Sequence, residues 1–424
     1  MPNVSLTAEQ QSSYRWVMAV VVGILMASSF VALSSFNAAA PQIAASIHQS
    51  ANTVAVFGGD SYSIALFLAF FLGHGGLFDT RIKTGVFVTQ VLLIVPQLLI
   101  PIAPTLWLIT ILRFCQGLEI MMVALFSLQL GGWFRESEKA LSLAFALGAI
   151  TGGGALGGIL VSAMSSLSWQ AMYYWTAVIM IVAAIIYFVF ARNAPTLQKQ
   201  LVEAKKSGQK HESAWKNPMT WLMGFIQIPL TWTLFSVGGF LPGMATKFGY
   251  NGTQVGHLMM IWGFAGFGAA FIGAFIGDSW AKNKKDRHGV FVARVGTITI
   301  ANVIFGIGAV LAMTLGKQSF GMMVVAAIFI AFMMMIPPNF WASPSALFPT
   351  ALVGAGAFGM GVISNSTSAI GPVVTSFLTP DVAFTLIAIL AAAGVILNLF
   401  GFRISARLNK PQASVGHSST QETL

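Results

Sequence analysis

Long apolar stretches separated by short polar breaks recur along almost the whole chain. A helix needs about 20 mostly apolar residues to cross the hydrocarbon core of a bilayer, and the stretches are long enough to do so. The pattern therefore predicts an all-α membrane protein with twelve transmembrane helices. The predicted spans cover residues 15–40, 52–78, 84–103, 106–132, 139–164, 169–191, 217–245, 252–277, 289–314, 318–346, 351–378 and 381–403.

The long charged segment between spans, residues 192–216, predicts a cytoplasmic linker with a short amphipathic helix around 197–206. It divides the chain into a six-helix bundle at 1–191 and a second six-helix bundle, with a short tail, at 217–424. The bundles echo each other, because an aspartate follows the second span of each and a glycine-rich run lies in the fifth span of each. Parallel repeats of this kind are typical of transporters with a substrate site between the halves.

Composition excludes a soluble protein, and the distribution of charge indicates an orientation. Only 8% of the residues are charged, against about 25% in soluble proteins, whose surface must be wetted. Lys and Arg gather in alternate loops and near both termini, whereas the opposite loops hold only Lys247 and Lys317. Because Lys and Arg resist translocation, both termini are expected in the cytoplasm. The net charge of +10 does not predict nucleic-acid binding, since the basic residues form no continuous patch.

Three short motifs add a family resemblance. The loop after the second span reads GGLFDTRIK at 75–83, the fourth span contains RFCQG at 113–117, and that span ends in WFRESEK at 133–139. Together, on the right helices of a twelve-span chain, these motifs resemble those of the major facilitator superfamily over nearly the whole length. The resemblance implies the major facilitator fold and a secondary transporter that works by alternating access, as a monomer.

Charged residues near the cytoplasmic ends of the spans are candidate gate residues. The resemblance implies that Asp79 pairs with Arg135 or with a neighbouring helix end while the protein is open to the outside. Asp278 holds the matching place in the second half and is given the same role. A solvated pair is worth only about 0–1 kcal/mol, which is weak enough to break in each cycle. The alternative is that Asp79 only anchors its loop.

Four ionisable residues stand out within predicted spans, where an ionisable group costs about 2.5–3.5 kcal/mol on insertion scales. Arg113 either binds a carboxylate through its planar fork or holds a helix carbonyl. Glu119 is either a proton carrier or a permanently protonated buried acid, and Asp60 is a second candidate for proton coupling. A spacing of six residues turns a helix by about 240°, so Arg113 and Glu119 are not expected to pair directly. Arg294 lies near the cytoplasmic end, where snorkelling to the headgroups explains it.

Polar and aromatic side chains of the other cavity-facing helices are candidate substrate contacts. Pro337, Pro338 and Pro344 predict breaks in the tenth span, because proline removes an intrahelical hydrogen bond. The second half has no acid within a predicted span, so we expect proton coupling in the first half and substrate contacts in both. The predicted substrate-binding residues are Arg113, Asn37, Gln227, Trp232, Asn339, Trp341 and Asn365.

The tenth and eleventh spans favour one class of substrate. The run PNFWASPS at 338–345, followed by Gly371-Pro372, is similar to the anion:cation symporters, which carry organic anions such as carboxylates. Together with Arg113, this resemblance implies proton-linked movement of a small organic anion. The rival hypothesis is an efflux antiporter for lipophilic compounds. The motif NAAAP at 37–41 and a cavity with two acids against one arginine favour that rival.

No enzyme motif accompanies the spans. The sequence shows no metal-ligand cluster, no nucleophile beside a base and no phosphate-binding loop, so we expect neither catalysis nor a cofactor or metal. The first 14 residues lack the cleavage site of a signal peptide, so the first span is expected to stay in the membrane. The short loops fit a bacterial cytoplasmic membrane. The expected partners are a small-molecule substrate, protons and the lipid bilayer.

Overall fold

The computed structural model describes residues 7–73, 78–164, 166–206, 213–284, 286–349 and 352–408. Within these ranges every regular element is a helix, and eleven of the helices are long and apolar enough to cross a membrane. A further long helix, α16 (Val353–Ser376), stands in the bundle with them and is less apolar, because polar residues follow one another from Ser364 to Ser368. The predicted fold class, an all-α membrane protein, is confirmed.

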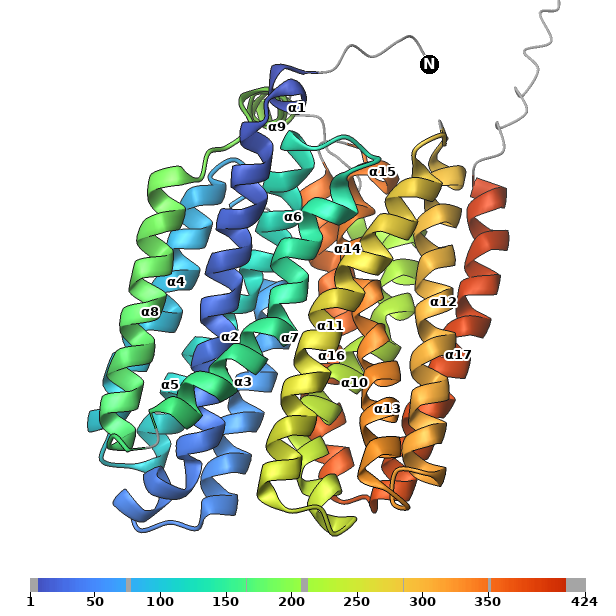
Figure 1. Cartoon of the computed structure of the whole chain (residues 1–424). Helices are drawn as coiled ribbons and strands as arrows, with labels where there is room; N and C mark the ends of the chain where they lie inside the picture. The colour runs from blue at the N-terminus through green and yellow to red at the C-terminus, as the bar shows by residue number, and fades with distance from the viewer. Residues whose placement is uncertain are drawn as a thin grey trace, which may run out of the picture.

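The helices form two groups that stand side by side, with α9 (Pro195–Lys206) between them in the sequence (Figure 1). The N-terminal group contains α2 (Tyr14–Ser46), α3 (Ala51–Gly73), α4 (Ile82–Leu99), α5 (Leu106–Gly117), α6 (Met122–Trp133), α7 (Lys139–Ala163) and α8 (Trp169–Phe190). The C-terminal group contains α10 (Pro218–Lys247), α11 (Gly252–Ala281), α12 (Arg287–Thr314), α13 (Phe320–Ala331), α14 (Ile336–Ala342), α15 (Pro344–Leu347), α16 and α17 (Pro380–Leu408).

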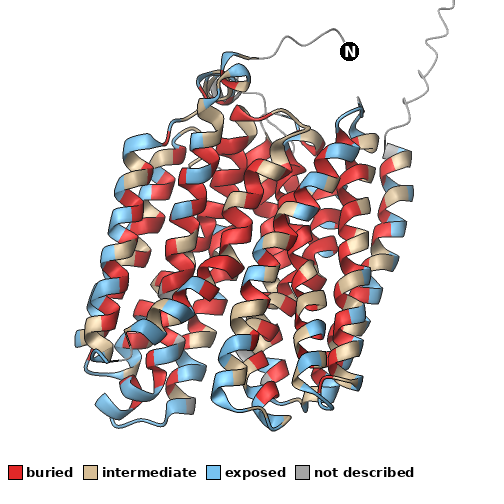
Figure 2. Ribbon diagram, in the orientation of Figure 1, coloured by how far each residue is buried: buried red, intermediate tan, exposed pale blue. Residues whose placement is uncertain are grey.

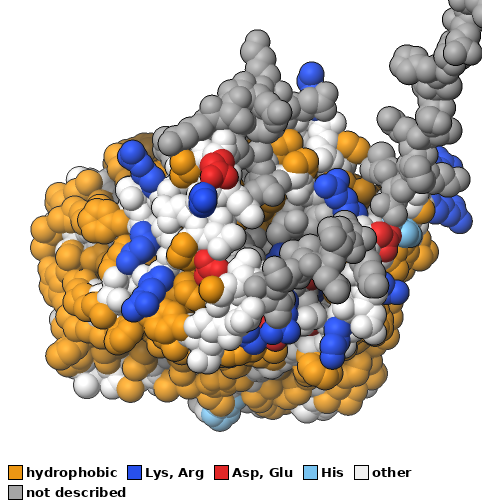
Figure 3. Space-filling model, turned by 90° about the horizontal axis from the view of Figure 1, so that it is seen from above, with side chains coloured by type: hydrophobic (Ala, Val, Ile, Leu, Met, Phe, Trp, Pro, Cys, Tyr) orange, Lys and Arg blue, Asp and Glu red, His pale blue; other side chains and the backbone are white. Residues whose placement is uncertain are grey.

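One end of the bundle, here called the charged end, carries α1 (Ala8–Gln11), α9 and α15 (Figure 1). Seen from this end, the surface shows Lys and Arg side chains with fewer acids among them (Figure 3). The amphipathic helix predicted within the linker is present as α9. Its first turn is held by Glu9 of α1, whose carboxylate accepts hydrogen bonds from the Thr196 amide and hydroxyl, both at 2.9 Å. At the opposite end, helices begin at polar caps such as Ser168 and Asn251.

Two spans are interrupted at matching places. The fourth changes from α5 through a short 3₁₀ helix, η2 (Leu118–Met121), to α6, and the tenth changes from α13 through η4 (Phe332–Met335) to α14. The prolines at 337, 338 and 344 predicted the interruptions of the tenth span. The fourth span has no proline, and its interruption was not predicted. A 3₁₀ stretch within a helix often marks a functional hinge.

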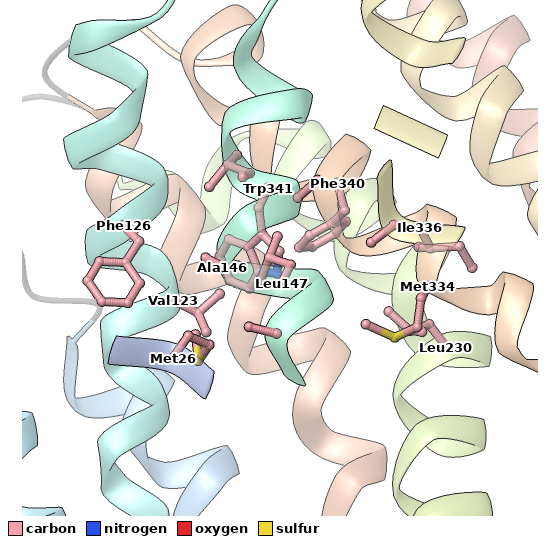
Figure 4. Close-up of a cluster of buried hydrophobic side chains, with 14 of the residues drawn as sticks. Met26, Val123, Phe126, Ala146, Leu147, Leu230, Met334, Ile336, Phe340 and Trp341 are labelled. Atoms are coloured by element: carbon pink, nitrogen blue, oxygen red, sulfur yellow. The ribbon is translucent and has the colours of Figure 1, made fainter. Parts of the chain in front are cut away.

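The two groups meet along tightly packed helices. α11 runs along α7, and α16 runs along α3. Phe145 of α7 and Phe271 of α11 make an edge-to-face ring contact with centroids 5.0 Å apart. Buried residues continue from one group into the other towards the charged end (Figure 2). Figure 4 shows this shared core, in which side chains of α6 and α7 lie near Phe340 and Trp341 of α14.

Candidate functional site

A buried arginine lies inside the N-terminal group. The Arg113 side chain, on α5, is only 1% exposed. Its Nη1 donates to Oε1 of Gln116 at 2.7 Å, and its Nε donates to the carbonyl of Gly58 at 3.3 Å. The guanidinium carbon lies 4.2 Å from the ring centre of Phe36 and 4.7 Å from that of Tyr62. Nη2 has no hydrogen-bond partner in the part of the chain that the structure describes, so the arginine keeps an unused donor group.

Amides extend this arginine into a network that crosses the N-terminal group. Gln116 donates to Oε1 of Gln97 at 2.8 Å, and Gln97 donates to the hydroxyls of Ser35 and Thr176 at 3.1 and 2.8 Å. These residues come from α5, α4, α2 and α8. Buried polar groups must find partners or pay the cost of desolvation. The network therefore fixes the position of Arg113. Its Nη2 is held in place without a partner among the described residues.

Glu119 lies in η2, at the interruption of the fourth span, and is completely buried. The Tyr62 hydroxyl donates to its Oε1 at 3.5 Å, while Oε2 has no hydrogen-bond partner among the described residues. Glu119 and Arg113 form no ion pair, as their spacing predicted. Instead, Tyr62 touches both, through its ring and its hydroxyl. We call Arg113, Gln116, Gln97, Tyr62 and Glu119 the inner polar cluster.

The other predicted coupling and substrate residues lie on several helices. Asp60, on α3, is partly exposed and forms no ion pair with Arg113. Gln227, on α10, is buried, and its Oε1 has no partner among the described residues. Trp232 packs beside Gly371 of α16. Asn365, on α16, donates to the carbonyl of Gly361 at 2.9 Å.

Asn37 is part of α2, but its side chain lies outside what the structure describes. Asn339, on α14, belongs to a different cluster from Arg113. It donates to the carbonyl of Gly273 at 2.9 Å and lies 3.4 Å from Nη1 of Arg294. Its place as a substrate contact stays a prediction.

A second cluster joins the two groups near the charged end. Arg294, on α12, is fully buried. Its Nη1 donates to Oδ1 of Asp278 at 2.6 Å, and its Nη2 donates to the carbonyl of Glu136 at 2.5 Å. The expectation that Arg294 snorkels to the headgroups is wrong, because its partners hold it inside the protein. We call Glu136, Asp278, Arg294 and Asn339 the gate cluster.

Asp278 lies in the last turn of α11, since that helix continues to Ala281 instead of ending at residue 277. The C-terminal half therefore does hold an acid within a span, which corrects the expectation of none. The carboxylate accepts hydrogen bonds from the backbone N–H groups of Ala140 and Leu141 at 3.1 and 2.8 Å. It thus caps the N-terminus of α7 in the opposite group, where the helix dipole favours a negative charge.

Asp79 makes the corresponding contact from the N-terminal group to a helix of the C-terminal group. A Cβ on Gly354, in the first turn of α16, would collide with the Asp79 carboxylate. Each group thus places one aspartate against the start of a helix in the other group. Lys139 donates to the hydroxyl of Ser345 at 2.6 Å, which adds a contact between the groups. Nε of Arg135 is buried without a partner in the described ranges, and its role in gating stays a prediction.

Trp341 also lies where the groups meet. Its ring stacks on Phe70 of α3 with centroids 5.6 Å apart, and its carbonyl accepts from the hydroxyl of Ser127 at 2.5 Å. Figure 4 shows Trp341 beside Phe340 and above Leu147 of the N-terminal group. This position does not test its predicted contact with substrate.

Glu136 is the member of the gate cluster that lies between spans. Burial alone would raise the pKa of its carboxyl, but Lys139 and Arg294 outweigh burial and hold the pKa below its usual range. Lys139 lies 2.9 Å and Arg294 3.4 Å from its carboxylate oxygens. Neither Glu136 nor Arg294 was proposed for the gate from the sequence. The signal available was the WFRESEK motif, which contains Glu136.

Comparisons with known proteins agree with this architecture. The sequence profile of the Major Facilitator Superfamily matches residues 22–301. No curated protein sequence matches the chain significantly. The crystal structure of the human organic anion transporter MFSD10 (TETRAN) is similar, with a TM-score of 0.70 and 13% sequence identity over 92% of this chain and 100% of that one. The chain is a multi-pass membrane protein and belongs to the Major Facilitator Superfamily, whose members are transporters and not enzymes.

Proposed function

We propose that this protein is a secondary active transporter that moves a small organic anion, a carboxylate, by proton-linked alternating access. The observation that carries the proposal is the unused Nη2 of the buried Arg113 guanidinium. A buried donor without a partner is costly, and a carboxylate oxygen accepts a short, charge-assisted hydrogen bond from an arginine N–H group. One solved structure with a similar fold, that of human MFSD10, is described as an organic anion transporter, and this supports the same substrate class.

The proposed moving parts are the segments 1–191 and 217–424, joined by the linker 192–216. The charge pattern assigns the charged end to the cytoplasm. On that assignment the gate cluster, the Asp79 contact and the stacking of Trp341 on Phe70 close the cytoplasmic side. To open that side, the N–H groups at the start of α7 would have to give up their hydrogen bonds to Asp278 and donate to water instead.

Glu119 is the proposed proton carrier, with Asp60 nearer the outside as a second acid. Tyr62 provides the link to the substrate, because it touches both Arg113 and Glu119. Protonation of Glu119 removes a negative charge close to Arg113. The positive charge of Arg113 then attracts an incoming anion more strongly. Gln227 is proposed as a substrate contact from the other group, where its unpaired Oε1 would accept a hydrogen bond from a donor group of the substrate. Asn37, Trp232, Asn339, Trp341 and Asn365 complete the proposed set of contacts.

A thermal-shift screen of the detergent-purified protein tests the substrate class. Mono- and dicarboxylates are expected to raise the melting temperature, because a ligand of the folded state stabilises it by mass action. Arg113→Ala should abolish the shift, and Arg113→Lys should weaken it, because lysine keeps the charge but not the fork. The proposal would be overturned if carboxylates still raised the melting temperature of Arg113→Ala while the ligand-free variant melted at a lower temperature than the unmodified protein. Arg113 would then be a structural residue.

The efflux antiporter for lipophilic compounds remains the second candidate. It is favoured by the acids, since neither Glu119 nor Asp60 forms an ion pair among the described residues. Such acids could attract a lipophilic cation. In the same screen, stabilisation by lipophilic cations alone would favour the antiporter, and Glu119→Gln should then remove it.

A further inference from the structure

A pocket of about 330 Å³ opens at the charged end of the C-terminal group, away from both clusters described above. Three helix ends and one loop form it. The residues before and at the start of α10, the first residues of α12 and the last turn of α17 make its walls, and Leu347, Pro349 and Leu352 lie on one side. All these elements belong to one group, so the pocket does not depend on how the two groups are arranged.

The pocket is basic. Lys216, Arg287 and His288 line it, and none of the other described residues that line it is acidic. No ion pair among the described residues includes Lys216 or Arg287. Asp286, the acid next to the pocket in sequence, is used as the N-cap of α12, where it accepts from the Gly289 N–H at 3.1 Å. The described lining of the pocket therefore carries basic side chains and no acidic one.

Further polar contacts and side chains complete the lining. Nδ1 of His288 lies 3.1 Å from the hydroxyl of Ser405, a contact that fixes the ring against α17. Ser213 and Asn217 add further polar side chains from the start of α10. A guanidinium, an ammonium and an imidazole around one space offer donors from several directions. A phosphate group, with acceptor oxygens on all sides, matches that arrangement better than a flat carboxylate.

Two tryptophans beside the pocket, Trp215 and Trp221, indicate its depth in the membrane. Nε1 of Trp221 donates to the carbonyl of Trp215 at 2.8 Å, and the two rings lie 5.7 Å apart. Trp215 directly precedes Lys216 of the pocket. Tryptophans concentrate where the hydrocarbon core meets the headgroups. The pocket therefore lies at the level of lipid phosphates.

Two of the helices that line the pocket, α10 and α17, also present an apolar surface. α10 and α17 pack together, so that a Cβ on Gly401 would lie 3.4 Å from Leu222. Exposed apolar side chains from both helices include Phe225 at 43% and Phe400 at 54% exposure. Acyl chains could cover this surface while the headgroup lies in the basic pocket. Basic pockets between helices on the cytoplasmic side are known to hold anionic headgroups.

From this juxtaposition we propose that the pocket formed by α10, α12 and α17 binds a phosphate group, carried by an anionic phospholipid or by a soluble phosphate compound. Lys216 and Arg287 supply the charge, and His288 supplies a third donor. The site is separate from the transport pathway, and its occupancy does not depend on which solute the protein carries.

The test uses the full-length protein in nanodiscs of phosphatidylcholine, with or without phosphatidylglycerol, and in detergent with inorganic phosphate. Each probe's effect on the melting temperature is measured over a range of probe concentrations. The double variant Lys216→Gln/Arg287→Gln should raise the half-saturating concentration by about 30-fold, since each basic residue near the surface contributes to binding anionic lipid. The matched control is Lys199→Gln/Lys282→Gln, which removes two exposed charges at the same end but outside the pocket.

Stabilisation by phosphatidylglycerol but not by inorganic phosphate, lost only in the pocket variant, identifies a lipid as the source. Stabilisation by inorganic phosphate, lost in the same variant, identifies a soluble phosphate. Absence of any shift in the unmodified protein would overturn the proposal. So would an equal loss in both double variants, because the binding would then reflect general surface charge.

Discussion

Buried charges in this protein fall into two kinds, according to whether their partners satisfy them. Asp278 accepts from one arginine and two backbone N–H groups, so its charge is well compensated. Arg113 and Glu119 each keep one terminal atom of the charged group without a partner in the described ranges, whereas the gate cluster leaves only Nε of Arg294 unpaired there. Breaking a compensated buried pair is costly, whereas an incompletely satisfied group is ready to accept a new partner. The first kind suits a closed gate, and the second suits a site that binds a substrate or a proton.

Glu136 gives a pH-dependent prediction. Its folded-state pKa lies below the usual 4.5. Its stabilising effect is therefore complete above that value and is lost as the pH falls through the folded-state pKa. Glu136→Gln should lower stability by about 1.5 kcal/mol near neutral pH, because it loses charge-assisted hydrogen bonds. Melting temperatures of the two proteins from pH 7 to pH 3 should converge in the acid range.

The matched control for Glu136 is Glu203→Gln on α9. Glu203 is 64% exposed and lies 4.0 Å from Lys199. The contribution of this ion pair to stability should therefore be close to zero. A difference between Glu136→Gln and the unmodified protein that stays constant down to pH 3 would contradict the assigned ion pairs.

At the scale of elements, the contact between α7 and α11 depends on glycine. A Cβ at Gly263 would lie 2.6 Å from the Cβ of Ala155 and 2.8 Å from the carbonyl of Thr151. Small residues let transmembrane helices approach closely, and packing holds them together there. On the same helix, a Cβ at Gly268 would meet nothing within 4 Å.

Gly263→Ala should therefore lower stability by about 1–3 kcal/mol through overpacking. Gly268→Ala should leave stability unchanged or raise it slightly, because alanine favours a helix more than glycine does. Thermal unfolding of both variants in the same detergent measures the difference. Equal melting temperatures would mean that α7 and α11 are not in tight contact in solution.

The sequence predicted the elements well where the physical signal is local. Apolar length marked the spans, and Pro337 and Pro344 marked the interruptions of the tenth. The interruption at η2 has no proline, and its local signal is weak. Gly117 lies there so close to the carbonyl of Tyr62 that a Cβ would not fit, but that contact comes from another helix.

The site residues were harder to predict than the spans, because their partners lie far away in the chain. Arg113 and Glu119 stood out as charges inside apolar runs. Arg294 lies near a helix end, so its sequence position suggested the headgroups. Only the packing of α11 and α12 places Asp278 against it.

At the scale of the whole molecule, two groups of helices are joined at the charged end by reciprocal contacts. Asp278 caps α7, and Asp79 lies against the start of α16. Because each contact is made by one group on the other, separation of the groups at this end would break both. They support a transport cycle in which the groups rock about a site between them.

Uptake by proteoliposomes tests the central proposal most directly. The purified protein is reconstituted, a proton gradient directed inwards is imposed, and accumulation of a radiolabelled carboxylate from the thermal-shift screen is measured. The account predicts accumulation that disappears when the gradient is collapsed, and that is lost in Arg113→Ala and in Glu119→Gln. Absence of gradient-driven carboxylate uptake, together with proton-driven export of a lipophilic cation, would contradict it and establish the antiporter instead.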